Sequence, residues 1–382
     1  MMRYFRWPSR YISAPCLGAL ALASLVACGG GGDSDPVLSN TPSLPTAIRS
    51  SPQASTCSAL RSGSYRYVAN GPGSDNTGVV VIDAENLTVT DVSGSSQLVA
   101  TPGAGKCRFT TDTGGNWAVS PAGVIVGQFD EAPYVGGILF PEQTHTVAEL
   151  AGEWNGVTLE ADGGGPRHLV GFTLPINASG KLTGAVFCDP LDSACMTAGA
   201  TEVDDVTASI NSVGGFNFTN ATIGRTDRLF AYRAGGGELM LVVVRTSGDI
   251  GFFTRKVART LPTVGELTTG WVIRLVPGVT PPFTSPTILS FEQTIATVDA
   301  ATGGYTRTVP FNSTGDTLTE SLIINNPRDG YVRRKQETVL GSDGSSQTVA
   351  GFINLPLRGM GMSAVGRLDG SDTLVLGVIS AE

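Results

Sequence analysis

Histidine is almost absent from the sequence, since only His145 and His168 occur among its 382 residues. A hydrolase of the Ser-His-Asp type needs a base within hydrogen-bond reach of its serine. The Gly-x-Ser-x-Gly pentapeptide that commonly carries such a serine is also missing, and two histidines 23 residues apart do not suggest a catalytic metal site. We therefore predict no catalytic, cofactor-binding or metal-binding residue, and we expect both histidines at the surface or in turns.

Charged residues are few, at 15% of the chain, and acidic residues outnumber basic ones. The first 28 residues contain three arginines and no acid, so the remainder carries 22 basic against 33 acidic side chains. A protein this negative repels a phosphate backbone, and nucleic-acid binding would need a strong basic stripe. The nearest candidate, Arg333-Arg334-Lys335, follows Tyr331 and Val332 and is interpreted as the solvent side of a strand. The sequence therefore excludes nucleic acid as a partner.

Helical periodicity is lacking as well, because no window of a dozen residues repeats its apolar positions with a period near 3.6. Fifty glycines, with many threonines and valines, suit short strands joined by tight turns. The predicted fold class is all-β, built from tandem antiparallel modules that are small barrels or sandwiches, with few short helices.

The longest apolar run near the start, residues 14–27, is too short for a membrane-spanning helix, which needs about 20 apolar residues. It follows an arginine-bearing, acid-free start and ends at Leu25-Val26-Ala27-Cys28, the layout of a secretory signal with small residues at the cut. This tetrapeptide resembles the lipobox of bacterial lipoproteins. The resemblance implies a signal peptide over residues 1–27, acylation (palmitate) of Cys28, and membrane attachment through several acyl chains.

Gly29 follows the lipobox where lipoproteins retained in the inner membrane tend to have Asp. The resemblance thus implies a lipid-anchored protein of the outer membrane, facing the periplasm or the cell surface. The whole chain is also similar to the Gly-rich, uncharacterised outer-membrane lipoproteins of β-proteobacteria. The shared phrases are a Leu-x-x-Gly-x-Tyr-Arg opening at 60–66 and Phe-Pro-Glu-Gln at 140–143. This likeness implies no particular activity.

Residues 28–56 are rich in Gly, Ser, Thr and Pro and have little to bury, so we expect a lipidated cysteine followed by a flexible tether. Three β modules are expected after it, over residues 57–143, 144–262 and 263–382. They are suggested by a repeated opening in which a Leu precedes a Gly and an aromatic residue: Leu60 to Tyr65, Leu150 to Trp154, and Leu267 to Trp271. The alternative is that these are the loose matches any Gly-rich β chain offers.

Four cysteines remain once Cys16 leaves with the signal and Cys28 is acylated: Cys57, Cys107, Cys188 and Cys195. Three pairings are possible. We favour Cys188–Cys195, because the intervening Asp-Pro-Leu-Asp-Ser-Ala bends around a proline and closes a short loop, which leaves Cys57–Cys107. A zinc site would need closely spaced cysteine pairs with nearby histidine, and neither occurs.

The second opening has a further feature. Thr146-Val-Ala-Glu149 has capping-box spacing and predicts a helical turn. The following Gly152-Glu153-Trp154 resembles the start of lipocalin barrels, in which a short helical turn precedes a Gly-x-Trp strand that closes the barrel floor. Tyr65 replaces the tryptophan in the first module, and the spacer is lost at Gly270-Trp271, so the likeness suggests antiparallel barrels or sandwiches without assigning the family.

The predicted function is non-enzymatic. We expect a cell-envelope lipoprotein whose β modules bind a ligand or act as a scaffold, with the membrane as one partner through its lipid anchor. A small apolar ligand, a glycan or another envelope protein is the other expected partner, and no cofactor is expected. The alternative is an envelope glycan hydrolase that uses a carboxylate pair, but with 33 acidic residues the sequence nominates none.

Overall fold

The computed structural model describes residues 41–70, 76–91, 94–101, 106–112, 114–128, 136–161, 167–188, 195–197, 205–245, 247–275, 288–310, 317–340, 346–349, 351–367 and 374–380. The prediction of an all-β fold is confirmed. Within these ranges the helical elements are α1 (Thr46–Arg49) and the 3-10 turn η1 (Val147–Leu150). In the same ranges, no helix is long and apolar enough to cross a membrane.

A first closed barrel follows the short hairpin of β1 (Gln53–Ala54) and β2 (Cys57–Arg61). Each of its eight strands pairs antiparallel with the next, and β10 returns to β3. The strands of this first barrel are β3 (Gly63–Ala69), β4 (Thr77–Asp83), β5 (Thr88–Thr90), β6 (Ser95–Ala100), β7 (Arg108–Thr111), β8 (Asn116–Val119), β9 (Ile125–Gln128) and β10 (Gly137–Pro141).

The middle sheet has nine strands and keeps two edges, β14 and β15, although its first strand β11 pairs with its last strand β19. Its strands are β11 (Gly152–Ala161), β12 (Arg167–Ile176), β13 (Val186–Cys188), β14 (Cys195–Thr197), β15 (Val206–Ile210), β16 (Phe216–Asn220), β17 (Arg225–Arg233), β18 (Leu239–Val244) and β19 (Ile250–Arg255). All neighbours are antiparallel, so the middle sheet is an up-and-down meander like the first barrel.

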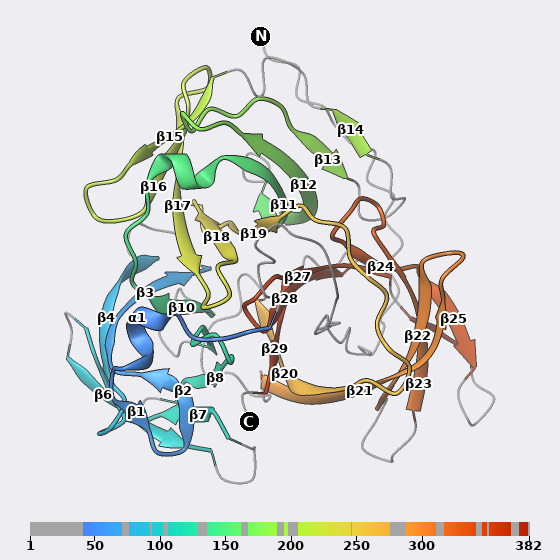
Figure 1. The fold of residues 1–382 in the computed structure, drawn as a ribbon, viewed down its shortest axis with the longest axis horizontal. Helices are drawn as coiled ribbons and strands as arrows, with labels where there is room; N and C mark the ends of the chain where they lie inside the picture. Colours follow the sequence, from blue (N-terminus) through green and yellow to red (C-terminus); the bar gives the residue numbers. More distant parts are fainter. Residues whose placement is uncertain are drawn as a thin grey trace.

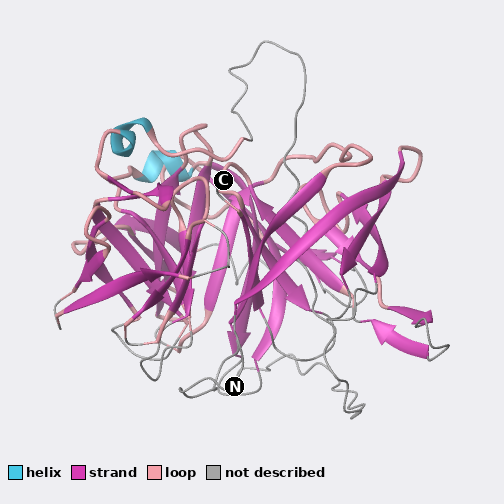
Figure 2. Cartoon of the chain, turned by 90° about the horizontal axis from the view of Figure 1, so that it is seen from below, coloured by secondary structure: helices cyan, strands magenta, loops and turns pink. Residues whose placement is uncertain are grey.

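The last barrel is closed by pairing of β20 with β29, and the hairpin of β25 and β26 projects between its fifth and sixth strands. Its elements are β20 (Leu267–Leu275), β21 (Ile288–Asp299), β22 (Gly304–Pro310), β23 (Thr317–Ile324), β24 (Val332–Arg334), β25 (Glu337–Leu340), β26 (Ser346–Val349), β27 (Phe352–Leu357), β28 (Met362–Arg367) and β29 (Leu374–Ile379). Figure 1 shows the three sheets grouped around a common centre, and Figure 2 shows both helical elements at the same end of the molecule.

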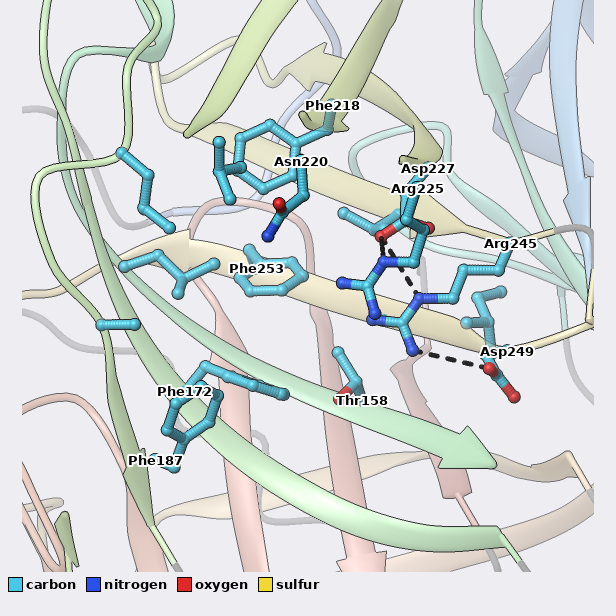
Figure 3. A pocket seen from close by; sticks show the side chains of 17 residues that line it. Thr158, Phe172, Phe187, Phe218, Asn220, Arg225, Asp227, Arg245, Asp249 and Phe253 are labelled. Atoms are coloured by element: carbon cyan, nitrogen blue, oxygen red, sulfur yellow. Dashed lines mark hydrogen bonds and ion pairs between the residues drawn. The ribbon is translucent and has the colours of Figure 1, made fainter. Parts of the chain in front are cut away.

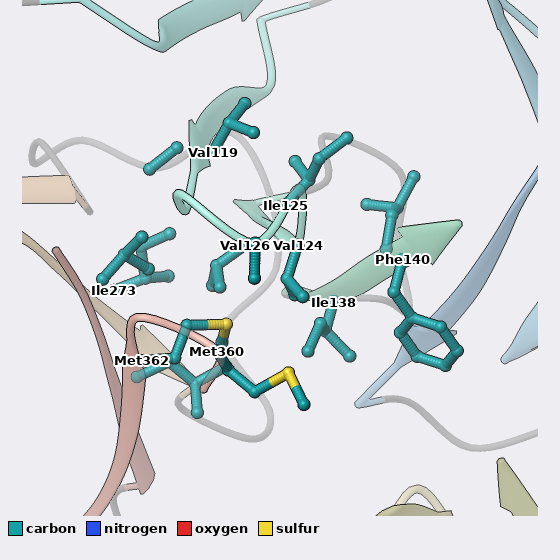
Figure 4. Close-up of a cluster of buried hydrophobic side chains, with 14 of the residues drawn as sticks. Val119, Val124, Ile125, Val126, Ile138, Phe140, Ile273, Met360 and Met362 are labelled. Atoms are coloured by element: carbon teal, nitrogen blue, oxygen red, sulfur yellow. The ribbon is translucent and has the colours of Figure 1, made fainter. Parts of the chain in front are cut away.

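That centre is a hydrophobic core to which all three sheets contribute their outward faces. Val126 and Ile138 of the first barrel lie near Met360 and Ile273 of the last barrel (Figure 4), and Phe252 of the middle sheet belongs to the same buried cluster. Burial of apolar surface is the main favourable contribution to folding. We conclude that the three sheets form one composite body.

Two buried tyrosines link the sheets across this core. The hydroxyl of Tyr232 on β17 donates to the carbonyl of Ala122 in the first barrel at 2.5 Å. The hydroxyl of Tyr331, just before β24, lies 2.8 Å from the carbonyl oxygen of Gly156 and 2.6 Å from that of Phe172. Burial raises the pKa of both hydroxyls, so they stay protonated donors.

Residues 41–56 are part of this body, so the prediction of a flexible tether is wrong for them. Leu44 is buried, and the Ser43 carbonyl accepts a hydrogen bond from the amide of Gly235 at 2.8 Å. A Cβ at Gly235 would lie 2.1 Å from the Leu44 carbonyl oxygen, so only glycine allows this close approach. Pro42 also lies against Gly361 of the last barrel. A Pro- and Ser-rich composition does not reveal that a few apolar side chains dock between sheets; residues 1–40 lie outside the described part.

Both predicted disulfides are present. Cys57–Cys107 joins β2 to the turn before β7, and Cys188–Cys195 joins β13 to β14. The loop-closure model assigns about 4 kcal/mol to a loop of the first length. Both bonds therefore fasten short peripheral strands to the sheets.

The interpretation of Arg333-Arg334-Lys335 as a solvent-facing run is wrong for the two arginines, which are buried, while Lys335 is exposed. Inside the last barrel, Arg334 forms an ion pair with Glu320. The Nε of Arg307 donates to the same carboxylate at 2.6 Å, and its Nη1 donates to Gln293 at 2.6 Å. Charged side chains can be buried inside a barrel when opposite charges pair there, and the composition of the chain does not reveal such pairing.

Candidate functional site

The middle sheet closes on itself only in part. Beyond the turn after β12, the backbone of residues 180–182 pairs with β15: the amide of Leu182 donates to the carbonyl of Val206, and that of Ala208 donates to the carbonyl of Gly180, both at 2.9 Å. The β13–β14 hairpin, in contrast, has no partner strand on its outer side in the described part of the sheet. The sheet is thus a barrel joined along part of its seam.

The turn η1 and Trp154 close one end of the barrel interior. Trp154 is fully buried and its indole nitrogen donates to the carbonyl of Leu150 at 2.7 Å. The guanidinium carbon of Arg255, on the last strand of the sheet, lies 3.9 Å from the centre of the indole ring. The arrangement of a helical turn followed by a Gly-x-Trp strand matches the geometry expected from the sequence.

The capping of η1 also follows the expected pattern. The amide of Thr146 donates to the Glu149 carboxylate at 2.6 Å, and Arg233 donates to it at 2.8 Å. Burial alone would raise the pKa of this carboxyl group, but the hydrogen bonds from Thr146, Arg233 and His145 lower it to about 2. Glu149 is therefore ionised at neutral pH and holds η1 against β17.

Above this closed end, the interior contains a cavity. The space in it that the centres of water-sized molecules can occupy is about 110 Å³, and it is partly open to solvent. Most of the lining is apolar, with four phenylalanines among it (Figure 3): Phe172, Phe187, Phe218 and Phe253. Binding sites for small molecules are commonly cavities of this kind, with an apolar wall and a few placed polar groups.

Gly156 makes room for one wall of the cavity. A Cβ at this position on β11 would lie 2.1 Å from the ring of Phe253, which is its cross-strand neighbour on β19. The ring of Phe172 lies 5.0 Å from that of Phe187 and 6.5 Å from that of Phe253, measured between centroids. The three rings form a continuous apolar surface on one side of the cavity.

Charged side chains gather at one end of the cavity (Figure 3). Asp227 Oδ2 lies 3.4 Å from Nε of Arg225 and 3.2 Å from Nε of Arg245. Asp249 Oδ2 lies 3.5 Å from Nη1 of Arg245 and accepts a hydrogen bond from the Ser247 hydroxyl at 2.8 Å. The two carboxylates therefore hold the two guanidinium groups side by side at the end of an apolar space.

The interiors of the two flanking barrels contain large side chains instead. Tyr65, Phe109 and Leu98 are buried in the first barrel, and the Arg307–Glu320–Arg334 cluster with Phe352 is buried in the last. Arg307 and Arg334 lie 5.6 and 4.9 Å from the Phe352 ring centre. In the described part of the chain, the middle sheet thus offers a cavity that is a candidate site for a small ligand.

The residues singled out in the sequence lie elsewhere. Cys28 lies outside the described residues, as does the side chain of His168. His145 lies in the irregular segment just before η1, and its side chain is 6% exposed and packs between Glu149 and Gln143, so it is not a surface residue. Burial lowers the pKa of His145.

The structure also bears on metals and on acid catalysis. The described residues include no group of three or more His, Cys, Asp or Glu side chains that could hold a metal ion. Burial raises the pKa of two carboxyl groups, Glu238 and Glu337, and neither lines the cavity. Glu238 forms an ion pair with Arg358 across the junction of the middle sheet and the last barrel, with 2.8 Å between Oε1 and Nη2.

The charged residues at the end of the cavity were not identified from the sequence. Their signal is the placement of Asp227 within a strand: it alternates with Leu229 and Ala231, which are buried in the interior of the middle sheet. An inward-facing charge on a strand needs a partner, and Arg225 and Arg245 supply it. Arg225 lies two residues before Asp227 on β17, whereas Arg245 follows β18 and is brought to Asp227 only by the folded sheet.

No protein-family model and no curated protein sequence match the chain. Among solved structures, a protein of unknown function from the DUF3598 family of Nostoc punctiforme aligns with 61% of this chain and 97% of its own, at 11% identity and a TM-score of 0.21. Isotype 1 transferrin binding protein B of serogroup B Neisseria meningitidis aligns with 82% of this chain, at 11% identity and a TM-score of 0.24, and 62% of that protein is covered. At these TM-scores neither likeness carries an argument about family, ligand or partner.

Proposed function

We propose that the protein is a non-enzymatic lipoprotein of the cell envelope that binds a small ligand with an apolar body in the middle sheet. Its anchor is an acylated Cys28, which attaches it to the outer membrane facing the periplasm or the cell surface. The first and last barrels support the binding sheet and give the body its rigidity.

The cavity in the middle sheet is the observation that carries the binding proposal. It combines four phenylalanines with a charged end, and it lies in the sheet that is closed along only part of its seam. Apolar walls supply most of the free energy of binding, and polar groups fix the orientation of the ligand. Large side chains are buried inside the flanking barrels, which favours a supporting role for them.

Filling the cavity is expected to abolish binding without unfolding the protein. Val243 lines the cavity, so Val243→Trp places an indole in the space that the ligand would use. We expect the affinity for N-phenylnaphthylamine, an uncharged dye that fluoresces in apolar sites, to fall about tenfold or more, which corresponds to about 1.4 kcal/mol. The full chain with Cys28→Ser is used, so that no detergent competes for the cavity.

The matched control is Val81→Trp, because Val81 lies on β4 of the first barrel and its side chain is half exposed. Dye affinity is expected to stay unchanged in this variant. Equal dye binding by the wild type and Val243→Trp would contradict the proposed site. Native mass spectrometry of protein exported to the periplasm adds a second measurement, because a bound mass that leaves on denaturation identifies the class of natural ligand.

The anchor is tested separately. Cys28→Ala removes the thiol that the acyl groups require, so the protein is expected to move from the membrane fraction to the soluble fraction. Fractionation followed by immunoblotting measures this shift, and Cys16→Ala serves as the control because Cys16 precedes the predicted cut. Continued retention of Cys28→Ala in membranes would contradict the lipid anchor and leave the cavity proposal untouched.

A further inference from the structure

The charged end of the cavity exposes hydrogen-bond donors and hides acceptors. The side chains of Asp227 and Asp249 are each 5% exposed, whereas that of Arg245 is 17% exposed and that of Arg225 is 49% exposed. The Nε atoms of both arginines face the same oxygen of Asp227. The two carboxylates are therefore nearly covered, and the arginines supply most of the exposed charged surface at this end of the cavity.

Arg225 is the better placed of the two to bind a ligand. Its Nε faces Asp227 at 3.4 Å, and its two terminal nitrogens have no partner among the residues that the structure describes. A guanidinium group presents its donors in a planar fork that matches the two oxygens of a carboxylate or a phosphate. Arg245 lies beside it and is paired with both Asp227 and Asp249, so the preference for an anion depends on the open donors of Arg225.

The rest of the cavity suits a hydrocarbon chain. Leu174, Leu182 and Ala185 line it together with the phenylalanine rings. Outside the charged end, the polar side chains that line the cavity are Thr158 and Asn220. A ligand that satisfies both parts of the cavity needs one apolar chain and one acceptor-rich head.

The geometry points to an anionic single-chain amphiphile as the ligand, with a carboxylate or phosphate head at Arg225 and Arg245 and its chain among the phenylalanines. This inference rests on the proposed binding function, which it makes more specific. A free fatty acid and a single-chain phospholipid both offer this chemistry, and the headgroups in the experiment separate them.

The experiment measures displacement of N-phenylnaphthylamine from the full chain carrying Cys28→Ser by four amphiphiles of equal chain length: decanoate, decyl phosphate, decanol and decylamine. Charge-assisted hydrogen bonds contribute enough to favour the anions by about tenfold or more over decanol. Decylamine is expected to be the weakest. The better of decanoate and decyl phosphate indicates whether a fatty acid or a phospholipid is the source.

Arg225→Gln is the test variant, and it is expected to remove most of the preference for anions while decanol binds as before. Lys181→Gln is the matched control, because Lys181 is an exposed positive charge of the same sheet that does not line the cavity. Equal displacement by all four amphiphiles, or an anion preference that survives Arg225→Gln, would overturn the headgroup assignment and leave the binding function standing. Failure of the dye and of every amphiphile to bind would overturn both.

Discussion

Glu320→Gln is expected to lower the free energy of unfolding by about 3–5 kcal/mol, because it leaves two buried guanidinium groups without their carboxylate. Glu320, Arg307 and Arg334 are each 3% exposed or less. Glutamine keeps the size of the side chain and loses only the charge, so the effect reports on electrostatics and not on a cavity. Urea denaturation followed by tryptophan fluorescence measures the change.

Glu292→Gln is the matched control, since Glu292 is an exposed residue on β21 of the same barrel. It is expected to change stability by less than about 0.5 kcal/mol. A third protein replaces all three charged residues by Met or Leu, and it is expected to be more stable than Glu320→Gln, because no unpaired charge remains. A stability of Glu320→Gln equal to that of the control would show that the buried arginines reach water.

This cluster marks a limit of what the sequence could predict. Alternating strands, turn residues and the absence of helical periodicity suffice to predict an all-β chain, because they depend on neighbours along the sequence. Arg334 depends instead on Glu320, which lies on β23 and faces the same barrel interior. From the sequence alone, Arg333 and Arg334 were taken for a solvent-facing pair, because nothing along the chain points to a buried carboxylate partner.

The hydrophobic core shared by the three sheets could not be predicted from the sequence for a related reason. All six residues of β27, Phe-Ile-Asn-Leu-Pro-Leu, are buried. Phe352 packs inside the last barrel, while Ile353 and Leu355 pack in the central cluster shared with the other sheets. A strand that is buried on both faces can be recognised from its apolar run, but the run does not say which neighbour covers the outer face.

The Cys188–Cys195 disulfide and the helical turn were predictable because each depends on a short segment. Cys188 and Cys195 are close in sequence, and once they pair only Cys57 and Cys107 remain. The binding cavity is the opposite case. Its charged end combines β17 with the turn between β18 and β19, and its apolar wall combines β12, β13 and β19, so its residues are assembled only by strand register.

Trp154→Ala is expected to cost about 3–5 kcal/mol of unfolding free energy, the usual range for removing a fully buried tryptophan. Its ring fills the closed end of the middle sheet below the cavity, contacts Arg255, and satisfies the carbonyl of Leu150. With the ring removed, η1 keeps its bonds to Arg255 and Arg233 but loses the indole that packs beneath it, and we expect the closed end of the cavity to open. Denaturation and dye titration are measured on the same protein, and both stability and affinity are expected to fall.

Trp154→Phe separates packing from hydrogen bonding. Phenylalanine keeps an aromatic ring for Arg255 and loses the donor to Leu150, so a loss of about 1 kcal/mol is expected, with dye affinity close to that of the wild type. Similar stabilities for the two variants would mean that the hydrogen bond, and not the ring, closes this end of the sheet. A stable Trp154→Ala variant with intact dye binding would mean that the cavity does not depend on its closed end, and the Gly-x-Trp strand would then have no role in ligand binding.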